Sequence, residues 1–308
     1  MNIISLFCGA GGLDLGLIQA GNNVVWANDI DGDAIATYNH NIGGEVVCAD
    51  IRDVDMHHLP DADAVVGGFP CQGFSMANLR RNGDDARNQL YRSFCDAVRI
   101  KRPKFFIAEN VKGILSLDGG SAIKKIVGDF SDAGYEVSVN LVNMADYGVP
   151  QIRQRVIILG QRTDMGSAQL LKLPQKTNSK DGNGLPKWKT MREAIGHFPE
   201  PDAPNDVKNH VGSSYRLNAR NFTGHRPTDP DKPSPTILAR GNGGGGVVAI
   251  PHYNGTRRLT IRESAAIQTF PDDFEFVGKN GSCYRQIGNA VPVRFGRLMG
   301  EQLMNIEP

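Results

Sequence analysis

The sequence lacks the features that define membrane, secreted and zinc-binding chains. In its 308 residues, no apolar run approaches the ~20 residues that a membrane-spanning helix needs. The N-terminus has no basic-then-apolar signal pattern, and the five cysteines are odd in number and form no C-x-x-C pair. We therefore expect a cytoplasmic protein with reduced thiols, no disulfide framework and no metal site.

An excess of charge of one sign is also missing from the chain as a whole, because the formal net charge is only +1. The distribution is uneven: residues 206–262 hold nine Lys or Arg against three Asp. Such an excess indicates either a solvated basic surface or a face that binds phosphates. Residues 163–257 are rich in Gly, Pro, Asn and Lys with little periodicity, which predicts a smaller, loop-rich domain.

What is present begins with a motif that follows a buried-strand pattern. Residues 62–66 are largely apolar, and Phe-Pro-Cys-Gln follows a pair of glycines. Cys71 should lie just past the carboxyl end of this strand, where open parallel sheets bind ligands, and Pro70 fixes the backbone before it. Residues 72–88 predict a long loop able to close over a substrate. Cys71 is either a nucleophile or a structural cysteine in a turn.

The N-terminal segment predicts a strand, a glycine turn and a helix in succession. The strand covers residues 2–7, the turn follows, and the helix covers 13–20. Together they form a seat for a nucleotide-like cofactor, because glycines allow close approach and a helix N-terminus offers unpaired N–H groups. Asp14 stands where a dinucleotide fingerprint has its third glycine. This departure weakens an NAD interpretation and is compatible with S-adenosylmethionine, which has no pyrophosphate.

Acidic residues follow the second and third predicted strands. Asp29 comes after the strand 23–27 and is placed to accept hydrogen bonds from ribose hydroxyls, whereas Asp31 should cap the next helix. Asp50 comes after the third strand and can accept from an adenine amino group while Ile51 packs on the ring. Three successive strand ends with a glycine turn or an acid predict a cofactor site more strongly than any one of them.

Later strand ends supply further candidates. Glu109 follows the apolar strand 105–108 and is either a proton-handling acid or a cap of the next turn. Arg153 and Arg155 lie two residues apart before the strand 156–160. An extended segment aims both at one anionic or carbonyl-rich target, unless they are surface arginines.

The remaining patterns complete the predicted architecture. Helices are expected over 89–101 and 121–133, and a strand over 135–142. Thr260 and Glu263 form a predicted capping box for a helix that runs through Phe270. An amphipathic helix over 293–305 can bury its apolar face only against the first domain.

Together these motifs resemble the ordered series of the DNA (cytosine-5) methyltransferases of bacterial restriction-modification type. In the family's order they are the cofactor motif, the nucleophile motif, ENV, QxRxR and two C-terminal motifs: Phe7–Gly12, Phe69–Gln72, Glu109–Val111, Gln151–Arg155, Arg258–Glu263 and Gly288–Val291. The resemblance covers essentially the whole chain except roughly residues 163–256, which in the family form the target recognition domain. One departure is Asp29, where many members carry Glu.

The resemblance implies an α/β fold with two parts. A Rossmann-like S-adenosylmethionine-dependent methyltransferase domain with a mostly parallel sheet would comprise residues 1–170, completed by 282–308. A smaller, loop-rich target recognition domain would comprise residues 171–281 and include the RxLTxRE motif. The protein would act as a monomer on double-stranded DNA, together with a restriction endonuclease that cuts the same site.

The resemblance also implies a mechanism. Cys71 would add to C6 of a cytosine rotated out of the duplex, and a methyl group from S-adenosylmethionine would pass to C5, leaving S-adenosylhomocysteine. Glu109 would hydrogen-bond the ring, and either Arg155 or the backbone amides of the loop after Cys71 would support the thiolate. The catalytic set is Cys71, Glu109, Arg153 and Arg155.

The resemblance further implies two sets of binding residues. The cofactor set is Phe7, Gly9, Ala10, Gly11, Gly12, Leu13, Asp29, Ile30, Asp50, Ile51, Pro70, Asn289 and Ala290. The DNA-contacting set is Gln72, Ser75, Arg220, Arg226, Arg240, Arg257 and Arg258. No metal ligand is expected.

Three other functions fit part of the sequence. A related methyltransferase that acts on transfer RNA shares the motifs, although a long basic variable domain favours duplex DNA. A catalytically inactive DNA-binding regulator is disfavoured because Cys71, Glu109 and Arg155 are all present. A nicotinamide-dependent oxidoreductase fits the first strand, turn and helix but explains neither the Phe-Pro-Cys-Gln motif nor the basic region.

Overall fold

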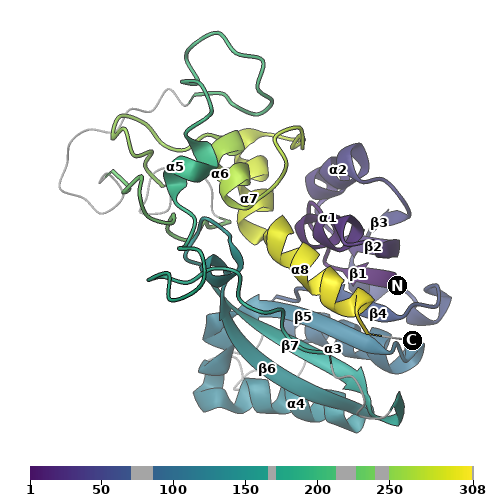
Figure 1. Ribbon diagram of the computed structural model, residues 1–308. Helices are drawn as coiled ribbons and strands as arrows, with labels where there is room; N and C mark the ends of the chain where they lie inside the picture. Colours follow the sequence, from purple (N-terminus) through teal and green to yellow (C-terminus); the bar gives the residue numbers. More distant parts are fainter. Residues whose placement is uncertain (71–85, 166–170, 213–226, 240–249, 307–308) are drawn as a thin grey trace.

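A seven-stranded sheet forms the centre of the protein, with strand order β3-β2-β1-β4-β5-β7-β6 (Figure 1). The computed structural model describes residues 1–70, 86–165, 171–212, 227–239 and 250–306, with backbone alone for 86–89. The strands are β1 Asn2–Leu6, β2 Asn23–Asp29, β3 Val46–Cys48, β4 Ala64–Gly67, β5 Phe105–Val111, β6 Tyr135–Asn143 and β7 Gln154–Arg162. The α-helices are α1 Gly12–Gln19, α2 Gly32–Asn41, α3 Ala86–Lys101, α4 Ser121–Asp132, α5 Met191–Ile195, α6 Ile261–Ile267, α7 Asn280–Asn289 and α8 Val293–Met304.

The sheet is mostly parallel, which confirms the predicted α/β class. β1 pairs in parallel with both β2 and β4, and β4 pairs in parallel with β5. β7 is antiparallel to β5 and to β6. Since the chain proceeds from β1 to one side through β2 and β3, and then to the other side through β4, the switch point lies between β1 and β4. Ligands bind at the carboxyl ends of strands at such a point.

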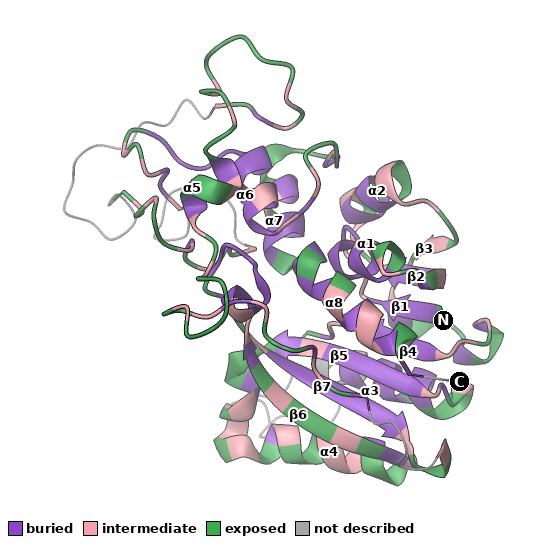
Figure 2. Cartoon of the chain, viewed as in Figure 1, coloured by how far each residue is buried: buried purple, intermediate pink, exposed green. Residues whose placement is uncertain are grey.

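Two apolar layers cover the two faces of the sheet. Alternate residues of each strand enter different layers: Ile4 and Val65 pack towards α3 and α4, whereas Ile3 and Val66 pack towards α1 and α8. Figure 2 shows β1, β4, β5 and β7 mostly buried, whereas the edge strand β6 is partly exposed. Helix α8 packs along α1, as expected for the C-terminal amphipathic segment.

A third apolar cluster lies apart from the sheet and holds α5, α6 and α7 together. It includes Met191, Ile237, Leu259 and Phe270, and long loops surround it (Figure 1). The predicted capping box is confirmed, because Thr260 accepts from the Glu263 backbone and Glu263 accepts from the Thr260 backbone.

In this region one prediction needs correction and one helix was missed. Helix α6 ends at Ile267 rather than at Phe270, because Thr269 adopts a left-handed backbone with φ 62°. Helix α7 was not predicted, since its sequence contains Gly281 and Gly288 and its N-cap Lys279 makes no capping side-chain hydrogen bond.

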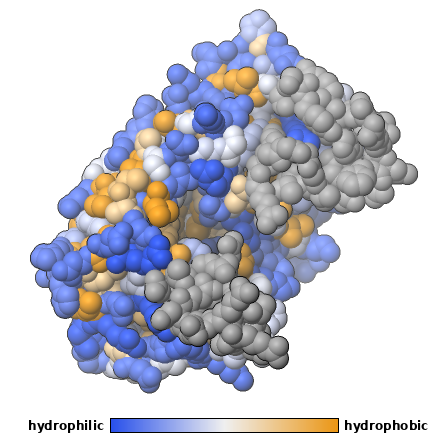
Figure 3. Space-filling model, turned by 180° about the vertical axis from the view of Figure 1, so that it is seen from behind, coloured by the Kyte–Doolittle hydropathy of each residue, from blue (hydrophilic) through white to orange (hydrophobic). Residues whose placement is uncertain are grey.

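In the described parts of the chain, no helix has both the length and the apolar character to cross a bilayer. Hydrophilic residues predominate on the face in Figure 3, and apolar residues form small patches between them. The four described cysteines, Cys8, Cys48, Cys95 and Cys283, are free thiols.

Candidate active site

A cavity of about 670 Å³ lies at the carboxyl ends of β1, β2, β4 and β5. It brings together predicted residues from segments far apart in the sequence. Eleven of the thirteen predicted cofactor residues line it: Phe7, Gly9, Gly12, Leu13, Asp29, Ile30, Asp50, Ile51, Pro70, Asn289 and Ala290. The other two, Ala10 and Gly11, belong to the same turn but do not line the cavity. A volume of this size accommodates a nucleoside-sized ligand.

The turn after β1 is held in shape by the carboxylate of Asp29. Its Oδ2 accepts from the Gly9 backbone N at 2.8 Å, and its Oδ1 accepts from the Asp31 backbone N at 2.9 Å. Burial raises the pKa of Asp29. Phe7, in the same turn, has the left-handed φ of 56° that bulky residues rarely adopt, and such backbone constraint clusters at ligand sites. Asp31 caps α2 through the Asp33 backbone N, as predicted.

The segments after β2 and β3 add an acid and an apolar surface to the cavity. Asp50 accepts from Nε of Arg52 at 2.9 Å and pairs with the Nη2 atom of the same guanidinium. The hydrogen bonds from Arg52 lower the pKa of Asp50 to about 2, so its carboxylate is charged at neutral pH. Ile30 is 67% exposed, and with buried Ile51 it gives the cavity apolar side chains that suit a flat ring.

Asp14 is a buried acid beneath the glycine turn that sequence reasoning noted only as a missing glycine. Its carboxylate accepts from the Ser5 hydroxyl at 2.7 Å and from the Tyr38 hydroxyl at 3.0 Å. Burial raises its pKa to about 6, although these two donors oppose that effect. The signal in the sequence was an acid in the first turn of an otherwise apolar helix.

Glu109 and Arg155 form the polar wall at the end of β5. Arg155 Nε lies 2.8 Å from Glu109 Oε1, and both side chains are mostly buried. A Cβ on Gly68 would lie 3.1 Å from Glu109 Oε2, so the backbone after β4 runs against this carboxylate. Asn110 Nδ2 donates to the Phe69 carbonyl at 3.0 Å and fixes that backbone. All three residues of the ENV motif therefore line the cavity, and Asn110 also holds the Phe-Pro segment.

Cys71, Gln72 and Ser75 lie outside the described residues. Pro70, next to Cys71 in the sequence, lines the same cavity as Glu109 and Arg155.

The prediction that Arg153 and Arg155 share one target is wrong. Arg155 pairs with Glu109, whereas Arg153 is 1% exposed and donates to backbone carbonyls. Its Nη1 lies 2.9 Å from the Ile237 O, and its Nη2 lies 2.9 Å from the Gly288 O. Burial lowers the pKa of Arg153. Its guanidinium holds three chain segments together, although the residue also lines the cavity.

The expected DNA contacts of Arg257 and Arg258 also need correction. The two side chains are buried, at 5% and 8% exposure. Arg257 makes a bidentate ion pair with Glu263 at 2.8 and 2.9 Å and also binds Glu200, so its charge is compensated inside the protein. Arg220, Arg226 and Arg240 lie outside the described residues.

Among the described residues of 206–262, the cations are buried or paired within the protein. Arg262 is buried and donates to the carbonyls of Lys208 and Pro271. Lys208 pairs with Glu275, and Lys232 pairs with Asp229. The described cations of 206–262 therefore serve intramolecular contacts. Because Arg257, Arg258 and Arg262 are buried, counting charges along the sequence overestimates how many of the described cations reach the surface.

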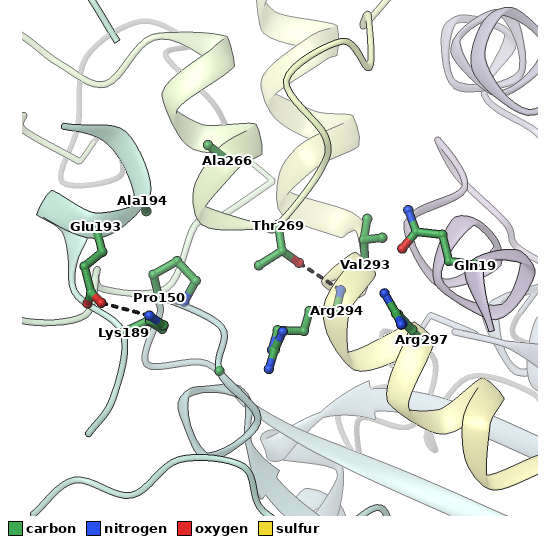
Figure 4. A pocket seen from close by; sticks show the side chains of 11 residues that line it. Gln19, Pro150, Lys189, Glu193, Ala194, Ala266, Thr269, Val293, Arg294 and Arg297 are labelled. Carbon is green, nitrogen blue, oxygen red and sulfur yellow. Dashed lines mark hydrogen bonds and ion pairs between the residues drawn. The ribbon is translucent and has the colours of Figure 1, made fainter. Parts of the chain in front are cut away.

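A second cavity, of about 370 Å³, shares no lining residue with the first. It lies between α8, the end of α6 and α5 (Figure 4). Arg294 and Arg297 of α8 point into it, and Lys189 across from them pairs with Glu193. In the described residues, no group of three or more His, Cys, Asp or Glu could hold a metal ion.

Comparison with known proteins identifies the family. Residues 1–305 match the family described as C-5 cytosine-specific DNA methylase. The chain belongs to this family. It is therefore a DNA cytosine-5 methyltransferase of the restriction-modification type, with the type II enzymes as its relatives.

Two such relatives illustrate the similarity. The type II methyltransferase M.NgoFVII of Neisseria gonorrhoeae is 40% identical over 314 residues, covering 94% of this chain and 83% of its own. M.MthTI of Methanothermobacter thermautotrophicus is 36% identical, covering 98% of this chain and 97% of its own.

Solved structures share the fold. A crystal structure described as a DNA modification methyltransferase encoded within an E. coli prophage superposes with a TM-score of 0.75 at 27% identity, covering 99% of each chain. The Dnmt2 methyltransferase of S. pombe superposes with a TM-score of 0.75 at 19% identity, covering 99% of this chain and all of its own, and shows the common fold.

Membership of this methyltransferase family implies S-adenosylmethionine as methyl donor, and the first cavity fits it. The carboxylates of Asp29 and Asp50 offer acceptors for hydroxyl and amino groups, and Ile30 offers an apolar face. The turn after β1 lies against the N-terminus of α1.

Proposed function

We propose that this methyltransferase modifies a cytosine within one short duplex site through a covalent adduct between Cys71 and C6 of the base. The observation that carries the proposal is the Glu109–Arg155 ion pair in the wall of the same cavity as the glycine turn and Asp29. This cavity combines groups for a pyrimidine ring with groups for a nucleoside cofactor. Pro70, which also lines it, directly precedes the nucleophile in the sequence.

The chemistry needs a thiolate because C5 of cytosine is too weak a nucleophile to take a methyl group unaided. A bond from Cys71 Sγ to C6 breaks the C5–C6 π bond and makes C5 an enamine carbon. S-adenosylmethionine supplies a methyl group on a positively charged sulfur, an electrophile for that carbon. Loss of the C5 proton to a base and departure of the Cys71 thiolate then restore the aromatic ring.

Glu109 and Arg155 stabilise the ring while its charge changes. The Glu109 carboxyl group is suited to hydrogen-bond N3 and the exocyclic amine, which become more basic as Sγ adds to C6. Arg155 fixes the orientation of Glu109 through the 2.8 Å contact and supports the nearby thiolate. Because both side chains are mostly buried, their charges act with little screening by water.

The cofactor residues have separate tasks in this proposal. Asp29 accepts from the ribose hydroxyls, Asp50 accepts from the adenine amino group, and Ile30 and Ile51 hold the ring. Asn289 and Ala290 close the cavity on the side of α7.

A cytosine stacked in duplex DNA cannot reach this cavity, so the base must rotate out of the helix.

We assign catalysis and cofactor binding to residues 1–170 with 282–308, and target recognition to 171–281. Gln72, Ser75, Arg220, Arg226 and Arg240 remain the proposed DNA contacts. The enzyme acts as a monomer and protects DNA from an endonuclease that cuts the same site.

The test is transfer of a labelled methyl group from S-adenosylmethionine to unmethylated duplex DNA, with the product mapped by bisulfite sequencing. We expect label at C5 of cytosines in a single short motif. Cys71→Ser should abolish transfer and leave DNA binding intact, and full turnover by this variant would remove Cys71 from the mechanism. Label on transfer RNA alone would contradict the proposed DNA substrate.

A further inference from the structure

Three buried side chains that take no part in the Glu109–Arg155 ion pair form what we term the buried amide network: Gln151, Arg153 and Gln268. Their exposures are 0%, 1% and 0%. Gln151 and Arg153 precede β7, and Gln268 follows α6, 117 residues from Gln151. Gln151 Nε2 donates to Gln268 Oε1 at 2.7 Å, which links the two ends of the network.

One side of the network holds the segment 234–237. The Ile237 backbone N donates to Gln151 Oε1 at 2.8 Å, and the Ile237 O accepts from Arg153 at 2.9 Å. Ser234 adds main-chain hydrogen bonds, because its N donates to the Pro150 O and its O accepts from the Ile152 N. The chain before β7 therefore fixes this segment of the proposed recognition domain, three residues ahead of Arg240.

The other side of the network holds the wall of the cofactor cavity. Gln268 Nε2 donates to the Ile287 O at 2.7 Å and to the Ala290 O at 3.0 Å. Arg153 Nη2 donates to the Gly288 O at 2.9 Å and to the Ala290 O at 3.1 Å. These carbonyls belong to the end of α7, where a helix leaves its last acceptors without internal partners. Asn289 and Ala290 line the cavity.

The two sides are also in direct contact. A Cβ on Gly288 would lie 2.3 Å from the Ala239 backbone N, so the end of α7 lies directly against the segment 238–239 and only glycine fits. Next to Gln268, Thr269 holds its left-handed backbone while its Oγ1 accepts from the Arg294 N at 2.9 Å (Figure 4). A β-branched residue keeps this conformation only where its surroundings enforce it. The junction therefore has little freedom to adjust to a shift on one side alone.

We propose that the buried amide network positions the segment 234–239 and the Asn289–Ala290 wall relative to each other, so that duplex DNA and the S-adenosyl cofactor bind cooperatively. The inference rests on the proposed assignment of 171–281 to DNA recognition. Because the junction cannot absorb a shift on one side alone, a ligand that favours one arrangement of one side favours the matching arrangement of the other. Since binding coupling is reciprocal, cofactor tightens DNA binding by the same factor by which DNA tightens cofactor binding.

The network also reaches the reacting groups. Arg155 follows Arg153 by two residues on the extended chain and pairs with Glu109. A shift of the segment 151–153 therefore moves the guanidinium that orients Glu109. Gln151 and Gln268 are positioning residues for the reaction, since neither lines the cavity.

The test measures the Kd of S-adenosylhomocysteine by calorimetry, without DNA and with a duplex that carries the mapped methylation site. For the wild type we expect binding about 10-fold tighter with the duplex, within the usual range of coupling. Gln151→Met and Gln268→Met each remove the hydrogen bond between these two side chains at nearly constant volume. The ratio of the Kd without the duplex to the Kd with it should then lie within about 2-fold of one. Each ligand alone should still bind these variants.

Asn178→Met is the matched control. Asn178 is also buried, and its Nδ2 donates to the Lys187 O at 2.7 Å, but it lies outside the network and the cavity. It should lower the melting temperature and keep the wild-type ratio. If Gln268→Met does not fold, Gln268→Asn replaces it, because the shorter amide stays polar but cannot span the same contacts.

Two results overturn the inference: a wild-type ratio near one, or an unchanged ratio in both network variants. In either case methylation of cytosine by the wild type would leave the proposed function standing. Absence of S-adenosylhomocysteine binding together with absence of methylation would instead refute the proposed function.

Discussion

At the scale of single residues, surroundings rather than residue type decide what each charged group does. Arg155 and Arg153 belong to one motif, yet Arg155 faces a carboxylate in the cavity wall and Arg153 faces backbone carbonyls. Asp29 and Asp14 are both acids near the glycine turn. Asp29 bonds backbone N–H groups beside the cavity, whereas Asp14 bonds two hydroxyls beneath the turn.

The Glu109–Arg155 pair gives a prediction about rate. Glu109→Gln keeps the shape of the side chain but removes the charge that pairs with Arg155 and the capacity to share a proton. We expect kcat to fall about 10²-fold or more, as for other preorganised groups that stabilise a transition state, with the Kd of S-adenosylhomocysteine unchanged. Single-turnover methyl transfer measures the effect.

The control for this prediction is Lys112→Gln, at the residue that directly follows the motif. Lys112 is exposed, and its Nζ bonds Gln154 at 3.1 Å outside the cavity. The Lys112→Gln variant should transfer methyl groups at the wild-type rate. A wild-type rate of methyl transfer by Glu109→Gln would exclude Glu109 from the reaction.

Asp14 gives a prediction about stability and pH. Because burial raises its pKa from 3.8 to about 6, the native state binds more protons than the unfolded state between these values. Its contribution to stability is therefore highest below about pH 4 and is lost as pH rises to about 6, by up to about 3 kcal/mol. Asp14→Asn should remove this loss.

Urea unfolding at pH 4 and pH 7 tests whether the contribution of Asp14 to stability falls as the pH rises. Relative to wild type, Asp14→Asn should be more stable at pH 7 and show no such gain at pH 4. A larger gain at pH 4 than at pH 7 would show that Asp14 is stabilised as the carboxylate by Ser5 and Tyr38.

At the scale of elements, the close packing of α8 on α1 brings the C-terminal residues to the sheet. A Cβ on Gly16 would lie 2.3 Å from the Val293 O and 2.4 Å from the Arg297 N. Helix α8 then continues from the Asn289–Ala290 wall of the cavity, so this packing supports the site as well as the core.

Gly16→Ala should therefore destabilise the protein by about 2 kcal/mol or more, because both neighbouring atoms are backbone and cannot move aside alone. Gly128→Ala in α4 is the matched control. Nothing lies within 4 Å of its added Cβ, and alanine should stabilise the helix by about 0.5–1 kcal/mol. The melting temperatures of the two variants should shift in opposite directions from the wild type, and equal shifts would contradict the packing argument.

At the scale of the whole molecule, cofactor binding and DNA recognition should be separable except through the buried amide network. Three arginines of the proposed recognition domain are proposed DNA contacts: Arg220, Arg226 and Arg240. Replacing them by alanine should weaken DNA binding and make it less dependent on salt. The Kd of S-adenosylhomocysteine without DNA should not change. Filter binding across a salt series measures the first effect and calorimetry the second.

A set of three exposed cations on α3 and α4 serves as the control: Arg99, Lys124 and Lys125. Their removal lowers the net charge equally, but none lines the cavity. An equal loss of DNA affinity in both triple variants would mean that charge alone, and not the location of these arginines, decides binding.

Local patterns were sufficient to predict the strands of the sheet and most of its helices. A parallel sheet places its strand ends along one edge, so residues after β1, β2, β4 and β5 had to meet there. Helix α7 and the early end of α6 could not be predicted, because packing in the third cluster and the left-handed Thr269 determine them.

The sequence by itself determined the chemistry of this protein: the motifs, their order and the strand ends that carry them are local properties of the chain. Only the tertiary structure decided which charged residues face the cavity and which hold the protein together. Arg153 reaches the carbonyl of Gly288, 135 residues away, and the charge of Arg257 is compensated by Glu263 and Glu200. Burial and pairing depend on partners that only folding brings within reach, and no local pattern contains them.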